Sequence, residues 1–302
     1  MSAPARPALG GLETPFRRLL REFTASLSAT AAAIVLLLVI LIAVFAPWIA
    51  PTDPYDLLNV SIMDNRRPPG SVSANGQLTY WLGTDGVGRD MLSAIVYGLR
   101  ISLIVGLMST MIAIIIGACI GLTAGYFGGW VDATIMRIVD LQLSFPAILI
   151  ALLLLALLGQ GVEKIIFALV AVQWAYYART ARAVALVERQ KEYVEAARSQ
   201  ALGDPRVIFQ HVLPNCLPPI IVVGTVQSAN AILLEATLSF LGLGLPPTEP
   251  SLGLLIANGF DFMMSGRYWV SLFPGLALFI LICAINIVGD QLRDISNPRT
   301  AK

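Results

Sequence analysis

The feature that most constrains this chain is a series of long intervals without any charged side chain. A helix that crosses about 30 Å of hydrocarbon needs roughly 20 mostly apolar residues. A charge at mid-span costs about 2.5–3.5 kcal/mol on insertion scales. Five intervals between charged residues meet the length requirement, with 30, 31, 22, 28 and 22 residues respectively: 23–52, 101–131, 141–162, 207–234 and 268–289. Each interval predicts a membrane-spanning helix.

A sixth span is predicted between Lys164 and Arg179, although only 14 uncharged residues separate them. Its end must contain Arg179 and Arg182, whose long stems can reach the interface. The chain is 57% hydrophobic and 13% charged, whereas soluble domains average about 25% charged residues. We therefore expect an all-α membrane protein with six transmembrane helices and exclude a water-soluble enzyme.

The placement of Lys and Arg predicts the orientation of these spans. With a cytoplasmic N-terminus, fourteen of the 20 basic residues lie inside and six lie outside. Both termini are therefore expected in the cytoplasm. The predicted order is a cytoplasmic segment 1–27, a first transmembrane helix 28–49 that is not cleaved, a periplasmic loop 50–97, a five-helix core 98–296 that contains a cytoplasmic loop 185–215, and a cytoplasmic tail 297–302.

The cytoplasmic loop has the chemistry of soluble helices. Residues 187–202 predict a helix, and Gly203 suits its C-terminal stop, where a positive φ favours glycine. Asp204 suits an N-cap and Pro205 a first helical position. A second, short helix would run to about residue 212 and end at Pro214. A connector needs only a few residues, so two capped helices favour a docking element over a solvated connector.

The sequence here resembles a known family. Glu195-Ala196-Ala197, followed sixteen residues after Glu195 by the segment 211–215 (HVLPN), resembles the EAA loop of bacterial ABC importer permeases. Further segments are similar to the dipeptide/oligopeptide/nickel branch: 82–90 (LGTDGVGRD), 124–132 (AGYFGGWVD), 238–244 (LSFLGLG) and 273–275 (FPG). The resemblance covers about residues 80–298. One departure is Ala201, which stands where the family has glycine, with Gly203 two places later.

The resemblance implies a type I ABC importer permease fold that forms half of a translocation pathway in the bacterial inner membrane. It implies a second homologous permease subunit, two cytoplasmic ATPase subunits, a periplasmic or lipid-anchored substrate-binding protein and surrounding lipids as partners. Peptide cargo is expected, with nickel chelates, glutathione and opine-like solutes left open. The residues assigned to ATPase coupling are Glu195, Ala196, Ala197, Ala201, Gly203, Asp204, Pro205, His211, Leu213 and Pro214.

The chain has no recognisable catalytic motif. A nucleotide-binding P-loop needs Gly-Lys-Ser/Thr, but none of the lysines, at 164, 191 and 302, follows a glycine. A single His and three scattered Cys predict no metal site. The net charge of +1 suggests no nucleic-acid partner. We expect no enzyme activity and no cofactor in this chain, with ATP and Mg²⁺ bound by the partner ATPase subunits.

Small residues form a stripe in the second span. Gly117, Gly121, Gly125 and Gly129 recur every four residues. Such a small-xxx-small pattern lets helix backbones approach closely. It predicts tight packing against a neighbouring span or against the partner permease.

Polar groups within spans are costly and therefore become functional candidates. Arg137 and Asp140 are spaced i, i+3 and either pair on one helix face or line the pathway. Glu235 is either a pathway or gate residue or an interhelical hydrogen bonder. Asn286 and Asp290 share those two interpretations, and helix–helix bonding is favoured for Asn286. The segment 173–177 (QWAYY) fits an interfacial aromatic belt better than a substrate cage.

Two other functional classes remain open on the sequence. An ion-gradient secondary transporter predicts inverted repeats and mid-membrane ionisable groups, and the chain shows no such repeat. A scaffold or channel subunit needs no coupling loop. Two interpretations of the loop 82–90 also remain open. Asp85 and Asp90 could bind a cation, but they lack the EF-hand pattern, so the loop can equally be a plain tight turn.

Overall fold

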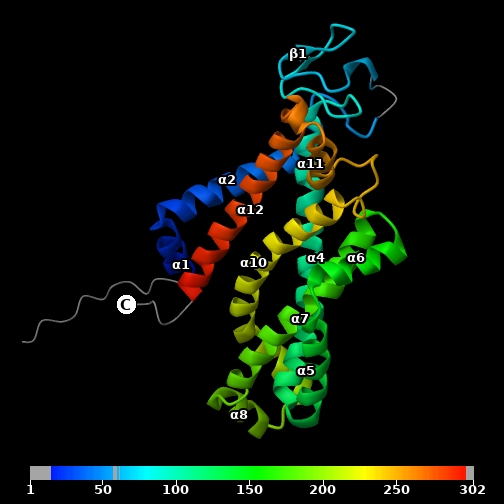
Figure 1. Cartoon of the computed structure of the whole chain (residues 1–302). Coiled ribbons are helices and arrows are strands. Elements are labelled where there is room, and N and C mark those ends of the chain that lie inside the picture. Colours follow the sequence, from blue (N-terminus) through cyan, green and yellow to red (C-terminus); the bar gives the residue numbers. More distant parts are fainter. Residues whose placement is uncertain (1–14, 57–59, 61, 297–302) are drawn as a thin grey trace, which may run out of the picture.

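A long helix organises the molecule. The structure, a computed structural model, describes residues 15–56, 60 and 62–296. Helix α4, Met91–Phe127, runs from a small β-hairpin at one end to a protruding turn of short helices at the other (Figure 1). We call these the hairpin end and the elbow end. The predicted tail 297–302 and residues 1–14 of the predicted N-terminal segment lie outside the described residues.

The other elements pack around α4 or extend from it. Helices α2 and α12 lie side by side, and α10 runs between them and α7 (Figure 1). The remaining elements are α1 Pro15–Thr24, α2 Leu27–Val44, α3 Ala46–Ile49, η2 Ile62–Asp64, β1 Ser71–Val72, β2 Thr79–Tyr80, α5 Gly129–Ser144, α6 Ala147–Leu158, α7 Val162–Glu188, α8 Glu192–Ser199, α9 Asp204–Val207, η3 Ile208–Val212, α10 Leu213–Phe240, α11 Leu252–Phe260, η4 Met263–Ser265 and α12 Trp269–Ser296.

The described residues contain four helices that are long and apolar enough to cross a membrane: Leu27–Val44, Met91–Phe127, Asp204–Phe240 and Trp269–Ser296. A fifth span results if α5 and α6, which are bent by 86°, are counted as one. The bend falls at Phe145–Pro146, because a residue before proline avoids the helical region and Phe145 is extended. The predicted count of six is therefore not confirmed.

The predicted fourth span corresponds to helix α7. This helix is not among the four membrane-crossing helices named above, because the half nearest the elbow end is too polar. Two of its arginines pair with carboxylates of α5. Arg179 Nη2 lies 2.5 Å from Asp140 Oδ1, and Arg182 holds Asp132 through two contacts, one of them at 2.6 Å. These ion pairs join α5 to α7.

The glycine stripe packs α4 against α7. A Cβ on Gly117 or Gly121 would overlap the carbonyl oxygen of Trp174 or Ala178, and one on Gly125 would lie 2.7 Å from Ala185 Cβ. The prediction of close helix packing is thus supported for three glycines. It is wrong for Gly129, which begins α5 with φ +53° and where an added Cβ would have no atom within 4 Å. The helix ends at Phe127, so the stripe ends with it.

Pro214 does not end a helix, contrary to the sequence prediction. The chain stays helical from Asp204 to Phe240 through the π-helical turn η3, and Pro214 lies in the first turn of α10. Proline has no N–H to donate, but Pro214 directly follows η3, where the Leu213 amide donates to Ile208 O in the wider π-helical pattern, and the helix continues past it. The Asn215 side chain also donates to the His211 carbonyl at 2.8 Å. Pro218 and Pro219 are accommodated within α10 as well.

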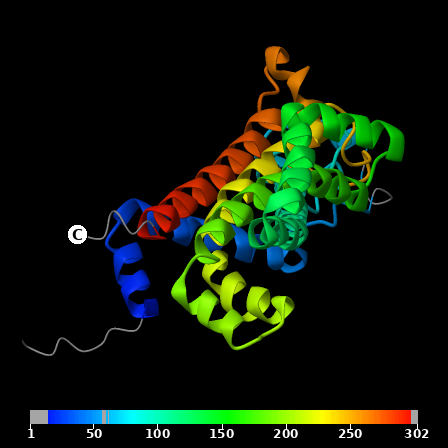
Figure 2. The same ribbon diagram turned by 90° about the horizontal axis from the view of Figure 1, so that it is seen from below.

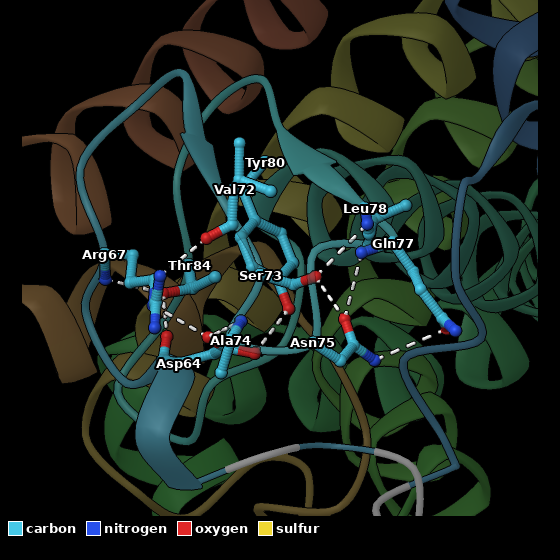
Figure 3. Close-up of polar contacts among 10 residues, drawn as sticks. All are labelled: Asp64, Arg67, Val72, Ser73, Ala74, Asn75, Gln77, Leu78, Tyr80 and Thr84. Atoms are coloured by element: carbon cyan, nitrogen blue, oxygen red, sulfur yellow. Dashed lines mark hydrogen bonds and ion pairs between the residues drawn. The ribbon is translucent and has the colours of Figure 1, made fainter.

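Residues 62–90 form what we call the hairpin cap, in which β1 and β2 pair antiparallel. The Asp64 carboxylate is its central acceptor. It pairs with Arg67 Nε at 2.7 Å and accepts hydrogen bonds from the Ala74 amide at 2.8 Å and the Tyr80 hydroxyl at 3.1 Å (Figure 3). Burial and this hydrogen bond raise the pKa of Tyr80 to about 12. The cap is shorter than the predicted loop 50–97, because α4 begins at Met91.

A buried ion pair completes the cap. Arg89 Nε lies 2.7 Å from Asp85 Oδ2, and the two side chains are 1% and 0% exposed. Asp85 also accepts the amides of Val87 and Arg89 at 2.9 Å each. Its carboxylate is therefore committed to the turn, and the residues that the structure describes contain no group of three metal-ligating side chains. The tight-turn interpretation of 82–90 is favoured over the cation.

Candidate functional site

Residues 189–212 form what we call the elbow, which joins α7 to α10 and projects from the bundle (Figure 2). Its inner side is apolar. Buried residues of α8, α9 and η3 pack on α4, α7 and α10 in one cluster: Val194, Ala197, Val207, Ile208 and Val212 against Leu122, Tyr126, Ala181, Ala185, Cys216 and Ile220. The elbow is thus continuous with the core between three long helices.

The turn between α8 and α9 is built on Ala201. Ala201 adopts φ +58°, its amide donates to Arg198 O at 2.9 Å, and the Leu202 amide donates to Ala197 O at 3.4 Å. This is the Schellman pattern that normally uses glycine. The prediction that Gly203 is the stop is wrong: Gly203 has φ −63° and is the N-cap of α9. The turn keeps the position at which the family has glycine, because Ala197 and Leu202 anchor it to the core.

The sequence predicts Asp204 as an N-cap, but it is the first residue of α9 and its carboxylate has another use. Asp204 Oδ1 accepts the Tyr126 hydroxyl at 2.7 Å. The same hydroxyl accepts Arg198 Nε at 3.2 Å, and the Arg198 guanidinium carbon lies 4.5 Å from the ring centroid. Tyr126, at the end of α4, therefore joins both arms of the elbow.

The end of α4 is also tied to the start of the elbow. Arg189 Nη1 donates to the Tyr126 carbonyl at 3.2 Å. That carbonyl is one of the last in α4, where no helical N–H remains to bind it. Together with the contacts of the ring and hydroxyl, this bond makes Tyr126 the shared contact of α4, α8 and α9.

A second polar cluster stiffens the junction of α7, α8 and α10. Glu188 accepts Lys191 Nζ at 2.6 Å and the Tyr193 hydroxyl at 2.5 Å. Asn215 Nδ2 donates to the Tyr193 oxygen at 3.1 Å. Burial and the Glu188 hydrogen bond raise the pKa of Tyr193 to about 12. Tyr193 therefore stays a neutral donor over the physiological range.

The outer side of the elbow is open to solvent. Glu195 is exposed, and within the described part of the chain its carboxylate has no hydrogen bond or ion pair. Phe209, on the second arm of the elbow, is 57% exposed. Of the predicted coupling residues, Ala197 is buried, His211 and Leu213 are half-buried, and the exposed ones are Glu195, Ala196, Ala201, Gly203, Asp204, Pro205 and Pro214. This is a rigid surface suited to protein contact.

The predicted pathway residues do not come together. Arg137 and Asp140 do not pair with each other: Asp140 binds Arg179, and Arg137 is exposed with no ion pair among the described residues. Glu235 is fully buried and accepts the hydroxyls of Ser102 at 3.0 Å and Ser239 at 2.9 Å, so it joins α10 to α4.

The two candidates on α12 lie apart from this cluster. Asn286 is half-buried and Asp290 is exposed, and neither side chain makes a hydrogen bond within 62–296. Interhelical bonding is the arrangement seen for Glu235. For Asn286 the predicted bonding has no partner in the described chain.

A groove that the sequence did not predict, lined by both polar and apolar side chains, lies between α6, α7 and α10. It has a volume of about 460 Å³ and is lined by Ala147, Ile148, Val172, Gln173, Tyr176, Gln227, Asn230, Leu233, Leu234 and Thr237. Gln173 and Tyr176 thus line a groove, whereas the sequence favours an aromatic belt for them. The available signal was the i, i+3 spacing of Gln227 and Asn230, which places two polar side chains on one face of the predicted span 207–234.

The fold and the elbow define a class of protein: a membrane subunit of a binding-protein-dependent transporter. The family model described as "Binding-protein-dependent transport system inner membrane component" matches residues 117–302. A second model, the "N-terminal TM domain of oligopeptide transport permease C", matches residues 14–69. The chain belongs to the family of binding-protein-dependent inner membrane components of ABC importers.

Particular relatives narrow the comparison. The di/tripeptide transport system permease protein DppC of Pseudomonas aeruginosa is 37% identical over 99% of this chain and 97% of its own length. The glutathione transport system permease protein GsiD of Pectobacterium atrosepticum is 38% identical over 95% and 92%. A chain of the MetNI methionine ABC transporter, in an inward facing conformation, matches with a TM-score of 0.56 and 19% identity over 68% of this chain and 98% of that one. The last likeness supports the type I importer fold.

Proposed function

We propose that this chain is a permease subunit of an ATP-driven importer of dipeptides or related short peptides. In this proposal it pairs with a second permease, and two separate ATPase subunits bind ATP and Mg²⁺ and drive the cycle. A periplasmic or lipid-anchored substrate-binding protein delivers the cargo at the hairpin end, and the elbow and both termini face the cytoplasm. Glutathione is the related cargo, because a glutathione permease is among the relatives.

The observation that carries the proposal is the elbow. Its inner side is continuous with the core between α4, α7 and α10. Its outer side presents exposed Phe209 and the carboxylate of Glu195, which has no partner among the described residues. A buried inner side transmits displacement to the helices, since packed interiors deform little. A carboxylate forms stronger hydrogen bonds than a neutral acceptor. We infer that Glu195 anchors the elbow in an ATPase subunit.

The test is charge reversal at Glu195 in the assembled complex. Glu195→Lys should leave the permease in the membrane but abolish co-purification of the ATPase pair or ATP-driven dipeptide uptake. The matched control is Asp261→Lys, the same charge change on an exposed residue at the hairpin end, which should retain the ATPase pair. Normal uptake and normal ATPase association by Glu195→Lys would contradict the coupling assignment. Failure of the wild-type complex to take up any peptide would contradict the cargo.

A further inference from the structure

One buried amide in the membrane part of the chain has no hydrogen-bond partner among the described residues. Gln173, on α7, is 3% exposed, and its Oε1 is completely buried without a hydrogen bond among the residues that the structure describes. Leaving such an acceptor unsatisfied costs roughly 1–3 kcal/mol. Gln173 lines the groove between α6, α7 and α10. The oxygen itself is covered by protein, so it would reach a guest in the groove only after rotation of the Gln173 side chain, and a hydrogen bond from the guest would then relieve its unsatisfied state.

The facing wall of the groove, on α10, carries polar, uncharged side chains beside Leu233 and Leu234. Asn230 Nδ2 donates to Gln227 Oε1 at 2.7 Å on α10, and Asn230 is exposed. Thr237 and Tyr176 add hydroxyls to the lining. Polar groups that face lipid are expensive, so intramembrane polar faces normally meet a bundle interior or water. The face of α10 that carries Gln227 and Asn230 fits a solvated path better than a lipid contact.

The lining favours one ligand chemistry. None of its residues is Asp, Glu, Lys or Arg. An amide side chain offers one acceptor oxygen and two donor hydrogens. A peptide group in an extended chain presents the matching N–H and C=O, which every peptide shares whatever its side chains. The groove is thus equipped to read the main chain of a peptide and to ignore the charge of its side chains.

We propose that this groove is a hydrogen-bonding station for the main-chain amides of a transported peptide, with Gln173 as its specificity-determining contact. The inference rests on the proposed function, because it names how the same importer handles its cargo. It assigns the groove to the translocation path and the Gln173 amide, once its side chain has turned to expose the buried oxygen, to a peptide N–H.

Water access to the groove is tested first, with the whole transporter reconstituted in vesicles. Asn230→Cys is introduced after Cys119, Cys216 and Cys283 have been replaced by serine. A cationic methanethiosulfonate reagent, applied on both sides, should label it, and saturating dipeptide should slow the labelling. The control is Leu37→Cys, a 56% exposed residue of the apolar α2, which should stay unlabelled. No labelling of Asn230→Cys in any nucleotide state would overturn the proposal.

The role of Gln173 is tested by uptake of three dipeptides, Ala-Ala, Lys-Ala and Glu-Ala. Each variant's rate is divided by the wild-type rate for the same peptide, so that the preference of the substrate-binding protein cancels. Gln173→Leu should lower uptake of all three by a similar factor, roughly three- to tenfold for one hydrogen bond. Gln173→Glu should favour Lys-Ala over Glu-Ala. The control Gln142→Leu removes an α5 amide that donates to Ala171 O at 3.0 Å and should not separate the peptides.

The outcomes distinguish the inference from the function on which it rests. An active wild type whose uptake is unchanged by Gln173→Leu, or a Gln173→Glu variant that treats all three peptides alike, overturns the groove assignment and leaves the importer intact. A wild type without ATP-dependent peptide uptake overturns the proposed function itself.

Discussion

The hairpin cap and the elbow lie at opposite ends of α4 and are stabilised in opposite ways. The cap holds its short strands and turns through internal polar contacts, chiefly those of Asp64 and the buried Asp85–Arg89 pair. The elbow is made of helices whose buried side joins the hydrophobic cluster of α4, α7 and α10. Its polar contacts, at Tyr126 and Glu188, bind it to those helices rather than to itself.

The difference suggests two mechanical roles. The cap contacts the rest of the molecule at a few points, among them Trp269 Nε1 to Thr84 O at 3.4 Å, Arg89 Nη1 to Pro247 O at 3.4 Å, and the Arg66 guanidinium carbon 3.7 Å from the ring centroid of Phe262. The elbow cannot move alone, because its displacement carries the ends of three long helices. A transporter that is driven from one end needs this asymmetry: a stiff transmitting end and a receiving end that can adapt to a delivering partner.

The largest expected effect tests whether the cap depends on its ion pair. Arg89→Met leaves the Asp85 carboxylate buried without its partner, which costs about 3–5 kcal/mol. We expect a marked loss of thermal stability in detergent and proteolysis within 62–90, with the elbow still resistant. Asp85→Asn/Arg89→Met keeps the acceptor for the Val87 and Arg89 amides and removes both charges, so it should recover much of the loss. A double variant no more stable than Arg89→Met would refute this account.

The next effect tests whether α4 and α7 move as one unit. A Cβ on Gly121 would overlap the Ala178 backbone, so Gly121→Ala should separate the helices and cost about 1–3 kcal/mol, the range for overpacking. Thermal unfolding in detergent measures it. Gly275→Ala, on α12 with no atom within 4 Å of the added carbon, is the control and should change stability little. Equal behaviour of the two variants would show that the stripe is not in tight contact.

A smaller effect separates coupling from stability by comparing two tyrosines. Tyr126→Phe loses the hydroxyl that joins Asp204 and Arg198, and Tyr80→Phe loses the one that binds Asp64. Each should cost about 0.5–1.5 kcal/mol, the net value of a typical hydrogen bond. Only Tyr126→Phe should lower uptake per ATP hydrolysed, because only that hydroxyl links the elbow to α4. Equal uptake per ATP in the two variants would contradict the asymmetry of the ends.

Features that depend on local sequence could be predicted, whereas contacts between segments far apart in the sequence could not. Charge-free intervals located α2, α4, α10 and α12, and the glycine spacing predicted close packing of α4 without naming its partner, because both depend on local composition and helical period. The bend at Phe145–Pro146 was missed, although Pro146 is visible in the sequence, since the interval contains no charge. The ion pairs of Asp140 with Arg179 and of Asp132 with Arg182 join residues 39 and 50 positions apart.

The site was predicted in outline for a similar reason. The helix-turn-helix character of the elbow followed from the Gly203-Asp204-Pro205 break in the loop, although the cap roles predicted for Gly203 and Asp204 were wrong. Its turn residue did not, because Gly203 is locally the better left-handed residue and only the packing of Ala197 and Leu202 shifts the turn to Ala201. The contacts of Tyr126 and the groove position of Gln173 could not be predicted, because both depend on helices that are distant in sequence.

The smallest effect tests that turn directly. Alanine at φ +58° carries the left-handed penalty of about 1–2 kcal/mol, and glycine removes it but adds about 0.5–1 kcal/mol of unfolded-state entropy. Ala201→Gly should therefore stabilise the protein slightly. Gly203→Ala should be nearly neutral: its φ is −63° and the nearest atom to an added carbon is 4.0 Å away, so nothing clashes, and the entropy gained by removing a glycine is offset by the loss of a favoured N-cap residue. Had Gly203 been the left-handed stop, the order would reverse, with Gly203→Ala clearly destabilising and Ala201→Gly without benefit. Thermal unfolding of the two variants in parallel separates these turns, and since the elbow is fused to the core, the same shift should appear in the unfolding of the whole bundle.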